Sequence, residues 1–288
     1  MTALLLTLLA ACSPQALLLR SAADALASQG SAPEEDLELA REASAFYLKL
    51  SESALRAQPG HLPLAQAVAG GFTQYAYAFV AFEADRLEST NAAAAQRLRE
   101  RAARLYLRAR GHSLAALEVG HPGLRAALAA GGDPDALRIG SLRADEVGVA
   151  YWAAASWAAW IALSTDSPEA VAQLPQAIAL ARAAWTVLPD FGDGALATLM
   201  GSLETARPGG STRQARAYFD RAVAISGGRS AAPFVAMAES LALPAGDRSA
   251  FESLLQQALA AADTRHDLPN AAMAERARWL LSSIAERF

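Results

Sequence analysis

The sequence is poor in cysteine, in histidine and in net positive charge, and each shortage excludes a class of protein. Its 288 residues include one cysteine, Cys12, which leaves neither a disulfide framework nor a zinc site built from several thiolates. The four histidines are scattered along the chain, and we expect no metal site. A formal net charge of −4 gives no basis for binding nucleic acid, which requires a basic surface.

What the sequence has in abundance is alanine. Hydrophobic residues make up 53% of the chain and charged residues only 19%. Because alanine is the best helix former and β-branched residues are few, the composition predicts an all-α fold. The length is enough to bury a sizeable core, and we expect a single repeat domain over residues 31–288.

A recurring spacing of small and bulky residues predicts degenerate tetratricopeptide-like (TPR-like) helical hairpins. In such repeats small residues let the paired helix approach closely, and a proline or glycine ends the helix. The copies are Ala177, Ala181, Ala184 and Pro189; Ala215, Phe219, Ala222 and Gly227; and, more weakly, Phe251, Leu255, Ala258 and Asp263. We expect about twelve helices, those of the second half lying at 169–188, 192–206, 211–226, 231–243, 247–261 and 268–287.

The first residues resemble the leader of a bacterial lipoprotein. A short apolar run ends in Leu9-Ala10-Ala11-Cys12, which is similar to a lipobox. We therefore expect a signal peptide at 1–11, lipidation at Cys12, and a tether with a first short helix at 12–30. The alternative is an apolar first helix with a buried cysteine. No later apolar run is long enough to span a bilayer.

Two sets of side chains are candidates for contacts with other molecules. One helical face carries Arg97, Arg101, Arg104 and Arg108, which form either a partner-binding edge or a solvated flank beside the core. Aromatic residues concentrate in two stretches and either fill the core or line an apolar cleft for a small ligand. The candidates for this lining are Tyr75, Phe79, Tyr151, Trp152 and Trp157.

No motif in the sequence indicates catalysis. Gly192-Asp193-Gly194 follows a helix rather than a strand, so it predicts a turn and not a phosphate loop. No nucleophile elbow is present. We expect a protein that is not an enzyme and has no cofactor and no metal.

The chain resembles the TatT family, the T component associated with tripartite ATP-independent periplasmic (TRAP) transporters. The resemblance covers nearly all of the chain after Cys12. The segments that carry it include 41–48, 73–80, 101–106, 151–157, 168–175 and 215–226, together with Ala238-Glu239, Asp247-Arg248, Phe251, Arg276-Ala277, Leu280-Leu281 and Phe288.

This resemblance implies a lipid-anchored protein of the bacterial cell envelope that faces the periplasm. It implies a homotrimer around an apolar pore that binds the periplasmic solute-binding subunit and an apolar ligand. The alternative is a TPR-type lipoprotein scaffold for envelope protein assembly. A superhelical hydrolase would need a convergent pair of acids, which the sequence does not show.

Overall fold

The chain folds into α-helices throughout the part that the structure describes. The computed structural model describes residues 14–29, 34, 36–130 and 142–288, so the expected signal peptide and Cys12 lie outside the described residues. No strand occurs in these ranges, and the all-α prediction is confirmed. The helices are α1 (Pro14–Gln29), α2 (Leu37–Ala57), α3 (Leu62–Ala76), α4 (Phe82–Leu87), α5 (Ala92–Gly120), α6 (Leu124–Ala129), α7 (Val147–Ala162), α8 (Pro168–Val171), α9 (Leu174–Val187), α10 (Ala195–Ala206), α11 (Thr212–Ile225), α12 (Ala232–Met237), α13 (Arg248–Ala262) and α14 (Leu268–Ser282).

Short polar side chains begin many of these helices. Asp36, Asn91, Ser211 and Asp247 each accept hydrogen bonds from backbone amides in the first turn of α2, α5, α11 and α13. These bonds satisfy donors that have no partner within the helix. The helix expected over 169–188 is divided into α8 and α9, because Pro175 in the first turn of α9 has no amide hydrogen for the preceding turn.

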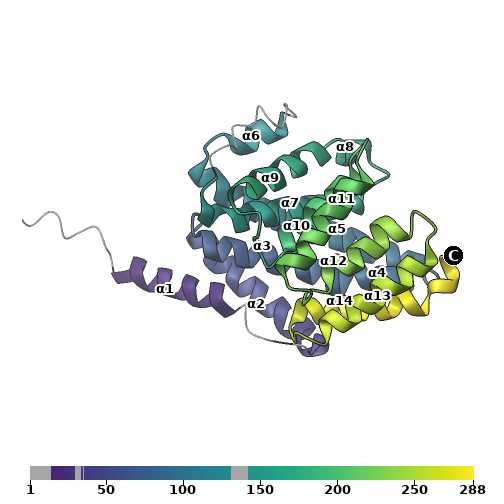
Figure 1. Ribbon diagram of the computed structural model, residues 1–288. Helices are drawn as coiled ribbons and strands as arrows, with labels where there is room; N and C mark the ends of the chain where they lie inside the picture. The colour runs from purple at the N-terminus through teal and green to yellow at the C-terminus, as the bar shows by residue number, and fades with distance from the viewer. Residues whose placement is uncertain (1–13, 30–33, 35, 131–141) are drawn as a thin grey trace, which may run out of the picture.

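The positions of the repeat spacing form the contacts between helices. Ala177, Ala181 and Ala184 of α9 are completely buried. The equivalent residues of α11 and α13 are buried to the same degree: Ala215, Phe219, Ala222, Phe251, Leu255 and Ala258. From α9 to α14, each helix packs against the next along the chain, and Figure 1 shows α9, α10 and α11 next to one another. The small residues of the repeat spacing therefore lie at the contacts between helices, as the spacing predicts.

Two of the continuous helical segments, α3 to α4 and the one that begins with α12, contain a π-helical turn. Segment η1 (Tyr77–Ala81) joins α3 to α4 without interrupting the rod, and η3 (Ala238–Ala242) continues α12. A π turn inserts one residue and so rotates the side chains that follow it; such turns are frequent at functional sites.

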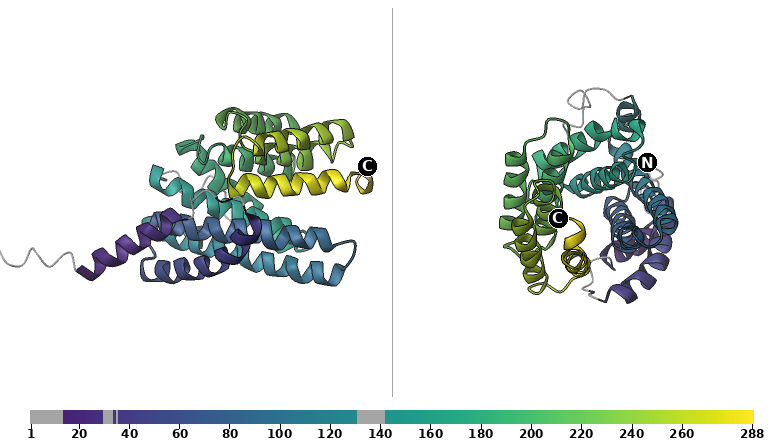
Figure 2. Two further views of the ribbon diagram at one scale, coloured as in Figure 1. Left: turned by 90° about the horizontal axis from the view of Figure 1, so that it is seen from below. Right: turned by 90° about the vertical axis from the view of Figure 1, so that its right-hand side faces the viewer.

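The array closes on itself, because the last long helix returns to the first half of the chain. Seen end-on, α14 lies between the C-terminal helices and the N-terminal ones (Figure 2). Its Trp279 packs edge-to-face on Phe82 of α4, with ring centroids 5.5 Å apart. The two halves of the molecule therefore face each other across an interior space.

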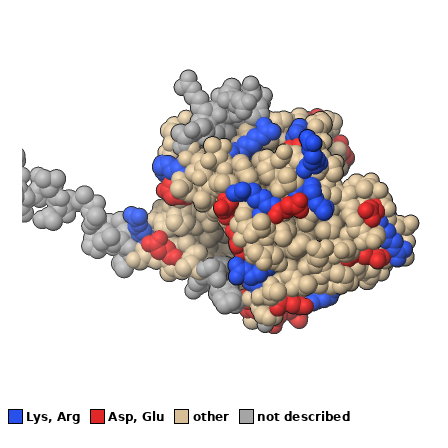
Figure 3. Space-filling view, in the orientation of Figure 1, with Lys and Arg blue, Asp and Glu red and all other residues tan. Residues whose placement is uncertain are grey.

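The described face in the view of Figure 3 is mostly uncharged. In the face shown in Figure 3, charged side chains are sparse, and blue and red groups lie next to each other. Between residue 14 and the C-terminus, no described helix combines the length and the apolar character that crossing a bilayer requires.

Candidate functional site

A large cavity lies between the two halves of the closed array. Its volume is about 2020 Å³. Helices α1, α2, α3 and α7 of the first half and α10, α12 and α14 of the second half contribute to its lining. Pockets for small ligands are commonly 300–1,000 Å³ in volume, so this space exceeds what one such ligand needs.

Aromatic side chains form one wall of the cavity. Tyr75 and Phe79 meet edge-to-face with centroids 5.5 Å apart, and Tyr151 meets Trp152 in the same way at 4.7 Å. All four line the cavity, so the structure brings together four of the five aromatic residues predicted to line a cleft. Phe191, from the loop before α10, joins them through Tyr151 at 5.3 Å, and sequence periodicity could not find it because it lies outside a helix.

Small residues in α3 allow this wall to form. A Cβ atom on Gly70 would lie 2.7 Å from Cε2 of Trp152, closer than such contacts occur in proteins. The indole therefore occupies space that only glycine leaves open. The π turn η1 follows in the same rod and contributes Tyr77 and Phe79 to the lining.

Trp157 does not line the cavity. It is 5% exposed, and its indole Nε1 donates a hydrogen bond of 3.1 Å to Oε1 of Gln173. The guanidinium of Arg110 lies over its ring at 4.6 Å and over Trp160 at 5.1 Å. Trp157 of α7 thus packs against Arg110 of α5 and Gln173 at the start of α9, and it does not join the other four predicted residues at the cavity.

The aromatic wall is electrically neutral at physiological pH. Burial raises the pKa of Tyr77 and of Tyr151 to about 12. Tyr151 is half-buried and lines the cavity. Because both phenols stay protonated, the wall offers ring faces and hydroxyl groups but no negative charge.

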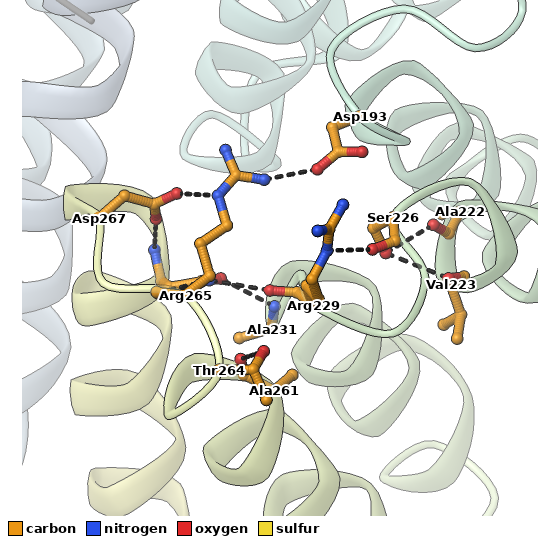
Figure 4. A network of polar contacts seen from close by, with 11 residues as sticks. Asp193, Ala222, Val223, Ser226, Arg229, Ala231, Ala261, Thr264, Arg265 and Asp267 are labelled. Carbon is orange, nitrogen blue, oxygen red and sulfur yellow. Dashed lines mark hydrogen bonds and ion pairs between the residues drawn. The ribbon is translucent and has the colours of Figure 1, made fainter. Parts of the chain in front are cut away.

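Polar and charged side chains gather at another part of the lining. Arg265 forms ion pairs with Asp193 and Asp267, and so joins the loop before α10 to the loop before α14 (Figure 4). Asn270 accepts a hydrogen bond from the amide of Ala231 at 3.0 Å and donates to the carbonyl of Arg229 at 2.9 Å. Asp193, Arg265, Asp267 and Asn270 all line the cavity.

The first helix also reaches this lining. Asp24 of α1 lies 3.0 Å from Nε2 of His61, and both residues border the cavity. The hydroxyl of Tyr47 in α2 donates to the carbonyl of Leu26. These contacts fix α1 at the edge of the cavity.

The predicted arginine edge divides into two parts. Arg97, Arg101 and Arg104 are exposed on α5. Arg108 instead forms an ion pair with Glu52 of α2, which also bonds His112 at 2.8 Å and Lys49 at 2.8 Å. Burial opposes ionisation of Glu52, but hydrogen bonds from Arg108, Lys49 and His112 outweigh it and hold the pKa of Glu52 well below its usual range. Arg108 therefore serves to join α2 to α5.

No group of side chains in the described residues could hold a metal ion. Asp193, in the Gly192-Asp193-Gly194 turn, forms an ion pair with Arg265. The cavity can bind a molecule through apolar and aromatic contact, with a few charged groups at its edge.

Comparison with known proteins identifies the family. The sequence profile of TAtT, the TRAP transporter T-component, matches residues 33–288. The chain belongs to the TRAP transporter T-component family. A 26% identical relative is an uncharacterized protein of Treponema pallidum (strain Nichols), aligned over 263 residues, 88% of this chain and 81% of the relative.

Family membership indicates an accessory role in TRAP transport. The T-component family consists of accessory transport components rather than known enzymes, and it is associated with the cell envelope.

Proposed function

We propose that this protein is a non-enzymatic, periplasm-facing lipoprotein that holds an apolar small molecule for a TRAP-type transport system. The aromatic wall of the cavity carries this proposal. Four rings from α3, η1 and α7 border a space of about 2020 Å³. Burial of apolar ligand surface against such rings contributes about 25 cal/mol per Å².

The proposal extends to the partner and to the membrane. The partner is the periplasmic solute-binding subunit, which would deliver or receive the ligand, and the exposed arginines of α5 are its candidate contact edge. Cys12 would carry the lipid anchor, two residues before α1 begins. A homotrimer is proposed on the family resemblance alone.

The ligand proposal is tested with the mature chain carrying Cys12→Ser and an apolar fluorescent dye, N-phenylnaphthylamine. We expect saturable binding, weakened by Trp152→Ala and by Tyr75→Ala, both at the cavity wall. Trp157→Phe is the matched control, since it changes a tryptophan of the same helix that does not line the cavity. Equal binding by all variants would show that the wall does not hold the dye.

The partner proposal is tested by purifying the same protein with the solute-binding and membrane subunits of a TRAP system. Co-elution with the solute-binding subunit supports it. Light scattering of the protein alone gives its oligomeric state, and a monomer would remove the trimer from the proposal.

A further inference from the structure

Two arginines cover the aromatic pair Tyr75–Phe79. The guanidinium of Arg41 in α2 lies 5.7 Å from the ring centroid of Phe79, and that of Arg101 in α5 lies 6.0 Å from the ring centroid of Tyr75. Both rings line the cavity, whereas neither arginine does. The aromatic pair therefore has the cavity at one side and two exposed guanidinium groups at its outer side.

Four of the six other stacked arginines in the described structure pair with a carboxylate as well as lying over a ring. Arg86 lies over Phe82 and pairs with Glu275; Arg221 lies over Trp185 and pairs with Asp190. Arg108 and Arg276 follow the same arrangement with Glu52 and with Asp85 and Glu239. Two further stacked arginines, Arg110 and Arg287, donate to the neutral side chains of Gln173 and Ser283.

Arg41 and Arg101 depart from this arrangement. Across the described ranges, neither has an acidic side chain at ion-pair distance or a side-chain hydrogen bond. The same holds for Arg97 and Arg104, which share a face of α5 with Arg101 because they lie four and three residues from it. We call Arg41, Arg97, Arg101 and Arg104 the arginine patch.

A polar cluster joins α2 to α5 near the patch. Glu52 of α2, about three turns after Arg41, binds both Arg108 and His112 of α5, and Arg108 lies about two turns after Arg101. The nearest acidic residues in sequence, Glu38, Glu42 and Glu100, form no ion pair with the patch. Glu100 instead accepts a hydrogen bond from Gln96 at 3.3 Å.

We propose that the arginine patch is a docking site for an acidic segment of a partner protein. Its carboxylates would pair with Arg41 and Arg101 as Asp and Glu residues pair with four other stacked arginines of the described structure. A guanidinium matches a carboxylate through two parallel hydrogen bonds, and carboxylates are the partners that four other stacked arginines have in the described structure. The inference rests on the proposed function for the existence of a protein partner, and it states that partner's chemistry.

The test uses a fluorescein-labelled helical peptide with glutamate at every fourth position and the mature protein carrying Cys12→Ser. We expect binding at low salt that weakens as salt rises. Arg41→Gln and Arg101→Gln should each weaken it about three- to fivefold, as expected for exposed charge pairs. Arg213→Gln is the matched control, because Arg213 of α11 is also exposed and has no ion pair in the described structure.

Three outcomes of the peptide experiment would overturn the inference. They are no binding of the glutamate peptide, equal binding of a glutamine version, and equal losses in Arg101→Gln and Arg213→Gln. Patch-dependent binding to vesicles of anionic lipid without peptide binding would also overturn it. Dye binding by the same variants is measured in parallel: if the dye binds and the peptide does not, this inference fails while the cavity proposal stands.

Discussion

Arg276 of α14 forms an ion pair with Asp85 of α4, with Nη1 3.0 Å from Oδ2, although 191 residues separate them in sequence. The same guanidinium binds Glu239 in η3 and lies over the rings of Tyr77 and Trp279. This side chain therefore holds the C-terminal helix against both π segments and closes the array around the cavity.

Removing the positive charge of Arg276 should weaken the packing of α14 against the first half of the chain. Arg276→Gln removes the cation that Glu239 pairs with and leaves Asp85 with Arg99 at 4.0 Å. Loss of one member of a mostly buried pair costs about 3 kcal/mol of unfolding free energy. Arg278→Gln, on the exposed side of the same helix, should cost about 0.5 kcal/mol or less. Urea denaturation followed by circular dichroism measures both, and equal midpoints would contradict the closure argument.

Ionisation of Glu52 should make the free energy of unfolding depend on pH in the acid range. Because its folded pKa is lowered, its contribution is fully present above its unfolded pKa of 4.5 and is lost as pH falls below that value. The urea concentration at the midpoint of unfolding should decrease in the native protein as the pH is lowered below about 4.5. The decrease should be smaller in Glu52→Gln. Identical slopes for the two proteins would show that Glu52 is not the group responsible.

Two half-buried tyrosines of the cavity lining should limit stability at alkaline pH. Tyr77 and Tyr151 have pKa values raised from 10.0 to about 12, so the unfolded chain loses these protons first. Stability should therefore decrease as pH rises from 10.0 to about 12. The tyrosinate absorbance of these residues should appear together with loss of helical signal. Tyr77→Phe and Tyr151→Phe should each reduce the decrease, and an unchanged profile in both would contradict it.

Two glycines offer a matched test of the cavity wall. Gly70→Ala places a methyl group 2.7 Å from the indole of Trp152, and the displaced ring should cost about 1–3 kcal/mol and shift its fluorescence. Gly111→Ala in α5 meets nothing within 4 Å and should stabilise the helix by up to about 1 kcal/mol. In thermal denaturation we expect Gly70→Ala to lower the melting temperature and Gly111→Ala to raise it. A higher melting temperature for Gly70→Ala would mean that the indole moves freely.

The sequence was sufficient for those features that depend on local spacing. Ala177, Ala181 and Ala184 are buried where the repeat pattern predicts, because helical periodicity alone places them on one face. Tyr75 and Phe79 share a wall for the same reason. Pro175 was visible in the sequence and could have shown the break between α8 and α9.

Other features depend on contacts between distant segments. Trp157 and Trp152 lie on one helix, but only the packing of α7 against α3 and α5 decides which of them faces the cavity. Arg265 and Asp193 come from loops without periodicity. The pair Arg276–Asp85 has no local signature, and neither do the π turns beside it.

The return of α14 to α4 restricts how this architecture can vary. In an open repeat array each unit contacts only its neighbours, so a unit can be gained or lost with a local change in stability. Here Arg276 and Trp279 must reach Asp85 and Phe82 at a fixed place on the first half. An inserted or deleted hairpin would separate α14 from its contacts on α4 and change the volume of the cavity. The number of repeats therefore helps to determine which molecules the cavity can hold.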